Sequence, residues 1–154
     1  MSNTDQIVIF TLNGQRYGIP LTMVERVVGM VEITPLPAGP EFIHGVINVQ
    51  GKILPVLNLR RRFSLPERPV ESSVQLIIIQ CATRRFVLMT DSSCDVRECT
   101  GQMQTDAAEI VSDLPYLTAV AKLPDGLILL QDPEALLTPD ESILIDEHIG
   151  CCQI

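Results

Sequence analysis

The apolar runs in this chain are short, and several of them place apolar side chains on both faces of the β-strand that they predict. Helical periodicity is nearly absent, and the runs are broken by Gly, Pro or Asp. In the run IVIFTL at 7–12, the two isoleucines point to one side, while valine, phenylalanine and leucine point to the other. The runs LIIIQ and LILLQ also place apolar side chains on both faces of a strand. A strand with two apolar faces needs a cover on each face.

Turn-forming residues separate the predicted strands. Asn13-Gly14 is a strong hairpin signal, Gln50-Gly51 joins two further strands, and Gly126 ends a turn that Pro124 begins. The predicted strands are 7–12, 16–19, 31–34, 42–49, 52–59, 74–81, 85–90, 96–99, 117–123 and 127–131. The segments 60–73 and 102–115 are predicted loops.

Helices are a minor part of the prediction. Pro20 can begin a short helix at 21–28, which Gly29 would end. A helical turn is predicted at 133–137 with Asp132 as its N-cap, and a short acidic helix is predicted after Pro139.

About nine or ten strands with frequent turns predict an all-β barrel or sandwich. Two small barrels packed on each other would supply the second cover that the two-faced strands need. A partner protein could supply part of it, and an ordinary sandwich with a thick core is the third possibility. The strand pattern leaves these alternatives open.

Composition and charge narrow the function. Apolar residues make up 46% of the chain and charged residues 19%, and an apolar surplus that the core cannot absorb predicts surface patches for partners. The net charge is -8, and Lys122 is the one basic residue after position 100. This balance argues against nucleic-acid binding, and the cluster 60–62 (RRR) is interpreted as a solvated turn.

No targeting segment, membrane span or metal site is predicted. The first residues lack a signal peptide, and no apolar run approaches a membrane helix, so the chain is expected in the cytoplasm. Five cysteines favour free thiols over disulfides, and His44 and His148 complete no convincing zinc site with them. The C-terminal CCQI is a chance match to a prenylation signal, and the roles of Cys151 and Cys152 stay open.

Catalytic motifs are also lacking. The remote enzyme hypothesis is a small hydrolase that uses Cys81 or Cys94 as nucleophile and His44 as base. The carboxylates of Asp91 and Asp95 are interpreted as turn formers rather than an acid–base pair. We therefore predict a protein that is not an enzyme and needs no cofactor.

Four stretches, in order, resemble the CheW-like domain family. They are FTLNGQRYGIPLTMVERVVG (10–29), FIHGVINVQGKILPVLNLRRRF (42–63), FVLMTDSSCDV (86–96) and YLTAVAKLPDGLILLQDPEALL (116–137). The resemblance implies two intertwined five-stranded SH3-like barrels with one or two short helices, over residues 1–140, followed by an acidic tail at 141–154.

The family couples methyl-accepting chemoreceptors to a CheA-type histidine kinase in bacterial chemosensory arrays. The resemblance therefore implies a non-catalytic cytoplasmic adaptor whose partners are the receptor tip and the regulatory domain of the kinase, at the membrane only through those partners. A regulatory or ligand-binding module outside such an array is the alternative. The implied receptor-binding residues, in an apolar groove between the barrels, are Val24, Arg26, Gly45, Gln50, Ser93 and Val96. No kinase-binding residue is implied.

Four positions depart from the family pattern. The family usually has an acid at Arg26, Arg at Gln50, Val at Ser93 and Asp at Asn58. We interpret the chain as a divergent or accessory member with its own receptor or a surface-sensing pathway, because charge placement at an interface sets specificity. On this hypothesis, Arg26→Glu with Gln50→Arg raises affinity for a generic receptor tip.

Overall fold

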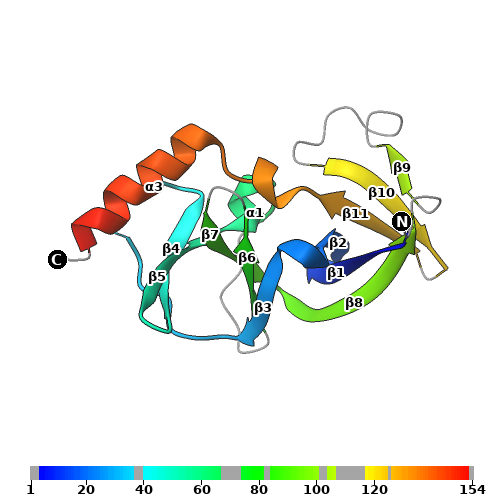
Figure 1. The fold of residues 1–154 in the computed structure, drawn as a ribbon, viewed down its shortest axis with the longest axis horizontal. Helices are drawn as coiled ribbons and strands as arrows, with labels where there is room; N and C mark the ends of the chain where they lie inside the picture. Colours follow the sequence, from blue (N-terminus) through cyan, green and yellow to red (C-terminus); the bar gives the residue numbers. More distant parts are fainter. Residues whose placement is uncertain are drawn as a thin grey trace.

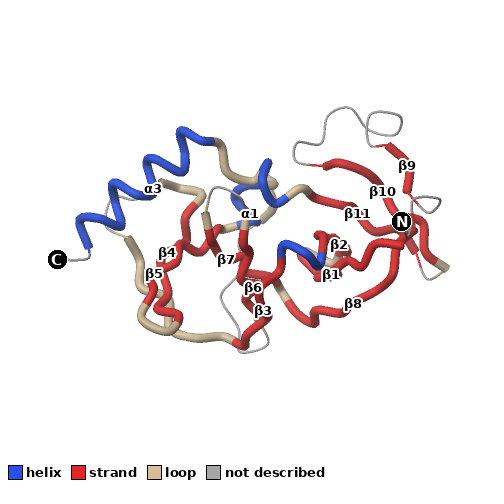
Figure 2. The backbone as a smooth tube through the Cα atoms, viewed as in Figure 1, coloured by secondary structure: helices blue, strands red, loops and turns tan. Residues whose placement is uncertain are grey.

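The computed structural model describes residues 4–36, 40–66, 74–81, 84–100, 104–106, 117–124 and 126–152. Strands dominate this part of the chain and form two sheets (Figure 1 and Figure 2). The five-stranded sheet contains, in hydrogen-bonded order, β3 (Val24–Gly29), β6 (Gln75–Gln80), β7 (Arg85–Thr90), β5 (Lys52–Leu57) and β4 (Ile43–Val49). The six-stranded sheet contains β8 (Ser92–Thr100), β1 (Thr4–Leu12), β2 (Gln15–Pro20), β11 (Gly126–Gln131), β10 (Leu117–Leu123) and β9 (Gln104–Asp106). The described helices are η1 (Leu21–Met23), α1 (Leu59–Arg62), η3 (Pro133–Ala135) and α3 (Pro139–Cys152).

The two sheets are intertwined. The five-stranded sheet uses consecutive strands, whereas the six-stranded sheet joins the first two strands to the last four. One parallel pair in each sheet, β2 with β11 and β5 with β7, brings distant strands together. An isolated bridge between Thr34 and Val46 places the segment after β3 against β4, the other edge strand of the five-stranded sheet. The prediction of two small intertwined barrels is confirmed, and the additional sixth strand is the three-residue β9.

The two faces of β1 pack into different cores, as the alternation predicts. Ile7 and Ile9 lie in an apolar cluster with residues of β10 and β11, inside the six-stranded sheet. Val8 and Phe10 lie in the largest cluster, which also contains residues of β4, β5, β6 and β7. One face of such a strand therefore packs inside its own sheet, and the opposite sheet covers the other face.

Strand β6 shows the same division in the five-stranded sheet. Leu76 and Ile78 pack inside that sheet with residues of β4 and β5. Ile77 and Ile79 face the shared cluster, and all four side chains are fully buried. Much of the apolar surplus in the composition is thus absorbed by a core that two barrels share.

The prediction of a helix at 21–28 is wrong. Only η1 is helical, and from Val24 the chain continues as β3, which pairs antiparallel with β6. Three valines lie in this segment, and β-branched side chains lose rotamer freedom in a helix but pack well on a pleated sheet. Pairing with the buried strand β6 therefore outweighs the helix start that Pro20 offers.

Other predicted boundaries also shift. The strand predicted at 31–34 is reduced to the bridge at Thr34, and the strand predicted at 52–59 ends at Leu57, because the Asn58 side chain caps α1 by accepting a hydrogen bond from the Arg61 N–H. The interpretation of 60–62 as a solvated turn is therefore wrong, because all three arginines lie in α1 and Arg60 is buried. Strand β8 is longer than the predicted 96–99. Strand β9 lies within the loop predicted at 102–115, whose other residues are outside the described part of the chain.

Helix α3 packs against the five-stranded sheet. Thr138 and Glu141 form a capping box, in which each side chain accepts a hydrogen bond from the backbone N–H of the other. Ile145 is fully buried in the shared cluster, and Glu141 forms a 2.7 Å ion pair with Arg62. Asp146 pairs with Arg84. Helix α3 runs across the boundary expected between residues 140 and 141, and Glu141, Ile145 and Asp146 attach this helix to the barrel.

Candidate functional site

A groove lies between the two sheets and is lined by residues of the edge strands β3 and β8. Figure 1 shows where these two strands run. The volume of the groove is about 440 Å³, and it is lined by Val8, Leu21, Val24, Glu25, Arg26, Val27, Gln75, Asp95 and Val96. Five of the nine lining residues are aliphatic and four are polar or charged, and Val96 keeps 48% of its surface exposed. An apolar surface with charged residues around it is typical of a site where another molecule docks.

A β-bulge in β3 creates the apolar wall of the groove. The register between β3 and β6 shifts between Val24 and Arg26, so Glu25 is the extra residue. Val24 pairs with Ile79 and Val27 pairs with Ile77, two residues apart on β6. Because residues two apart on a strand point to the same face, the bulge places Val24 and Val27 on one face, although three positions separate them.

The charged residues of the groove are arranged by strand. On β3, Glu25 forms a 2.6 Å ion pair with Arg85 of β7 and lies 3.9 Å from the Arg26 guanidinium. The Arg26 side chain keeps 43% of its surface exposed. On β8, Asp95 is exposed, and its Oδ1 accepts a hydrogen bond from the Val96 N–H. The prediction that Asp95 forms a turn is wrong, because it lies within β8.

Three of the six residues suggested by the resemblance meet in this groove. Val24 and Arg26 line it from β3, and Val96 lines it from β8. Val96 pairs with the buried Val8 of β1, so the exposed and buried valines form one continuous apolar strip. Ser93 lies on the same strand β8, but its side chain is outside the described part of the chain.

The other two residues lie on the β4–β5 hairpin, and neither lines the groove. Gln50 and Gly51 both have positive φ and form the exposed two-residue turn of this hairpin. Gly45 is buried, and a Cβ atom there would lie 2.5 Å from the carbonyl oxygen of Thr34. The close approach at Gly45 is therefore made by the chain itself. Arg26 lies on β3, whereas Gln50 directly follows β4, the opposite edge strand of the five-stranded sheet.

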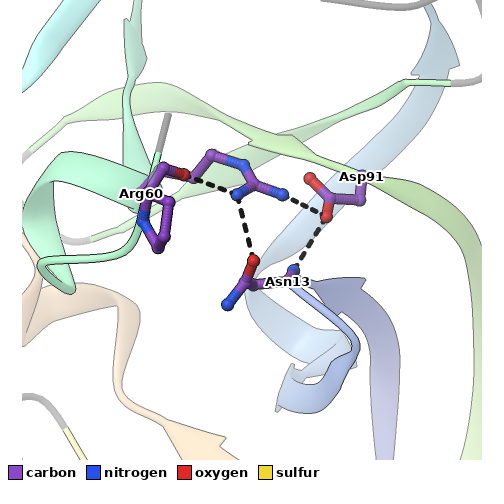
Figure 3. A network of polar contacts seen from close by, with 4 residues as sticks. Asn13, Arg60 and Asp91 are labelled. Atoms are coloured by element: carbon purple, nitrogen blue, oxygen red, sulfur yellow. Dashed lines mark hydrogen bonds and ion pairs between the residues drawn. The ribbon is translucent and has the colours of Figure 1, made fainter. Parts of the chain in front are cut away.

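A partly buried polar network joins the two sheets away from the groove lining (Figure 3). The guanidinium of Arg60 pairs with Asp91 and donates hydrogen bonds to the side chain of Asn13 at 3.3 Å and to the carbonyl of Pro66 at 2.7 Å. Asp91 also accepts from the Asn13 N–H at 2.8 Å. Asp91 lies between β7 and β8, where the chain passes from one sheet to the other, so this network fixes the crossing point.

The enzyme hypothesis finds little chemical basis in the described residues. Cys81 is buried, and burial with the nearby charges of Glu134 and Asp132 raises the pKa of its thiol to about 11. A thiol with this pKa stays protonated near neutral pH and is a poor nucleophile. His44 lies on β4, and the side chain of Cys94 is outside the described part. In the described ranges, no cluster of three or more His, Cys, Asp or Glu side chains could hold a metal ion.

Sequence reasoning missed several groove residues. Val27 and Glu25 are absent from the prediction because a helix is predicted at 21–28 in place of the bulged strand β3. Asp95 is absent because it is interpreted as a turn former rather than a strand residue. The signal for β3 was its β-branched composition. The pairing of Arg60 with Asp91 joins residues 31 positions apart and has no signal in a single sequence.

Comparisons with known proteins give consistent results. The profile of the family described as CheW-like domain matches residues 6–141. The chain is 30% identical to the chemotaxis protein CheW of Klebsiella aerogenes over 92% of this chain and 86% of that protein. It is 36% identical to the chemotaxis protein CheW of Treponema pallidum over 88% and 84% of the two chains.

A solved structure shows the same fold. The scaffolding protein TtCheW from Thermoanaerobacter tengcongensis superposes with a TM-score of 0.81 and 29% identity, over 89% of this chain and 94% of that one. No helix in the described residues is long and apolar enough to cross a membrane. The intertwined sheets, the profile match over most of the chain and these relatives together place the protein in the CheW-like domain family.

Proposed function

We propose that this protein is a non-catalytic cytoplasmic adaptor that couples chemoreceptors to a CheA-type histidine kinase in a chemosensory array. The observation that carries the proposal is the apolar groove between the sheets, with the exposed valines Val27 and Val96. Names and folds of the relatives support it, since they are chemotaxis and scaffolding proteins. The neutral thiol of Cys81 fits a protein without catalytic activity.

A helix of the receptor tip is the occupant that the groove suits best. Both walls are edge strands, and an edge strand can in principle pair with an added strand. However, β3 has a bulge at Glu25, and the pairing of β8 with β1 is irregular between Ile9 and Thr11. Bulges blunt an edge against strand addition, so recognition through an apolar helix face in the groove is favoured.

The second partner is the regulatory domain of the kinase, for which the family resemblance suggests barrel-to-barrel contact. The described structure singles out no surface for it. We therefore assign the groove to the receptor and leave the kinase-binding residues as an experimental question.

Co-purification with a receptor tip fragment and with a kinase regulatory domain tests the adaptor function. Val24→Asp and Val96→Asp should each abolish receptor binding, because a carboxylate would be buried in the apolar contact. Leu127→Asp is the matched control, since Leu127 is exposed on β11 outside the groove lining. Circular dichroism should show that the folds are retained.

Two results would contradict this assignment. If the wild-type protein binds neither fragment at high micromolar concentration, the adaptor function is wrong. If both groove variants lose their fold while Leu127→Asp keeps it, the two valines are core residues, and the groove is not the receptor site.

A further inference from the structure

The two walls of the groove carry opposite charge. On the β3 wall, Glu25 is shared between Arg85 at 2.6 Å and Arg26 at 3.9 Å, so two cations face one carboxylate. The excess positive charge belongs to Arg26, whose side chain is the more exposed of the two arginines. This wall is therefore positive.

The β8 wall is negative. Among the residues that the structure describes, Asp95 is the charged residue of this wall, and it is exposed. Its described hydrogen bond goes to the backbone N–H of the next residue, Val96, which leaves its negative charge uncompensated by that contact. Arg97 and Glu98 follow on β8 with opposite charges, and neither belongs to the groove lining. The apolar strip of Val24, Val27 and Val96 thus has a cation along one side and a carboxylate along the other.

Resting on the proposed function, we propose that these opposite charges fix the direction in which a helix lies in the groove. The occupant is an amphipathic helix with carboxylates along one flank of its apolar stripe and basic residues along the other. A helix turned end for end exchanges its flanks, so only one direction places carboxylates beside Arg26 and cations beside Asp95. The opposite direction juxtaposes like charges, which is how interfaces exclude a wrong arrangement.

A designed helical peptide of about 20 residues, with Leu at helical spacing and Glu and Lys on opposite flanks, tests the proposal. A spin label on its N-terminus broadens the NMR signals of nearby backbone amides in the ¹⁵N-labelled protein. In the wild type, the broadening should fall at one end of β3, near either Val24 or Gly29. In the double charge reversal Arg26→Glu with Asp95→Arg, it should move to the other end.

Affinities complete the test. Each single reversal should weaken peptide binding by about fivefold to tenfold at low salt, since it gives both walls the same sign. The double reversal should restore the affinity while inverting the direction. The matched control exchanges charges outside the groove, at the exposed residues Lys52 and Glu147, by Lys52→Glu with Glu147→Lys. It should change neither affinity nor direction.

The proposal is overturned if the label broadens the same end in the wild type and the double reversal, or both ends equally in the wild type. Absence of peptide binding also overturns it. The receptor-fragment assay tests the proposed function separately. If Val96→Asp abolishes receptor binding but the helix direction does not depend on the charges, the adaptor function stands and only this inference is wrong.

Discussion

Replacing Asp91 with alanine removes the carboxylate that neutralises a buried guanidinium between the two sheets. Arg60 is only 6% exposed, and its side chain is held by Asp91, Asn13 and the carbonyl of Pro66. Breaking a buried ion pair on one side costs about 3–5 kcal/mol, because the remaining charge is left without a partner. The two oxygen acceptors from Asn13 and Pro66 remain after the substitution, so we expect a loss at the lower end, about 3 kcal/mol.

Urea unfolding followed by far-ultraviolet circular dichroism measures this loss, since the chain contains no Trp. A loss of about 3 kcal/mol should lower the unfolding midpoint by about 1–3 M urea. The double variant Asp91→Ala with Arg60→Met should be more stable than Asp91→Ala alone, because methionine removes the stranded charge and retains much of the packing.

Arg26→Ala is the control for an ion pair at the surface. The Arg26 guanidinium lies 3.9 Å from Glu25, and the two side chains are 43% and 26% exposed, so the loss should stay below about 1 kcal/mol. Our reasoning is refuted if Asp91→Ala costs no more than this control, or if Arg60→Met adds a further independent loss in the double variant.

Three further predictions follow from described contacts. Ile145→Ala should cost about 2–5 kcal/mol in urea unfolding, whereas Ile143→Ala, 58% exposed on the same helix, should change stability by less than about 0.5 kcal/mol; equal effects would mean that α3 does not pack on the sheet. Gly45→Ala should cost about 1–3 kcal/mol, because its Cβ would press on the Thr34 backbone, and a neutral effect would contradict that close approach. The pKa of the Cys81 thiol is about 11 in the folded state, above that of an exposed thiol, so between about pH 8.5 and 11 only the unfolded state loses this proton and the free energy of unfolding should fall as pH rises. Cys81→Ala should flatten this decline, and a slope unchanged by the substitution would contradict the raised pKa.

The sequence patterns that predicted the fold correctly are those with a local cause. The turn at Asn13-Gly14 has positive φ at both residues, as the hairpin signal requires, and the alternation in β1 divides its side chains between two cores. The failure at 21–28 also has a physical cause. Pro20 and Gly29 stand where a helix would begin and end. The partner strand β6 lies about fifty residues later, so the stabilisation from pairing with it cannot be predicted from the local sequence.

The candidate site was predictable in part. The family resemblance placed Val24, Arg26 and Val96 at the groove, and the structure brings these three together. The resemblance could not show that the Thr34 backbone occupies the space beside Gly45, because that contact depends on how the segment after β3 returns to β4. Nor could it show the bulge at Glu25, which exists only in the register between two strands.

The intertwined strand order also sets a sequence of events during synthesis. The five-stranded sheet can complete its pairings once β7 has left the ribosome, but β2 must wait for β11, because Tyr17 pairs with Leu129. At about 5–20 residues per second, that wait lasts about 6–22 s. Throughout it, the face of β1 that carries Ile7 and Ile9 lacks its final cover, because that cover comes from β10 and β11. The first hairpin to be made is therefore among the last elements to complete its packing, and its uncovered apolar face is prone to aggregation until then.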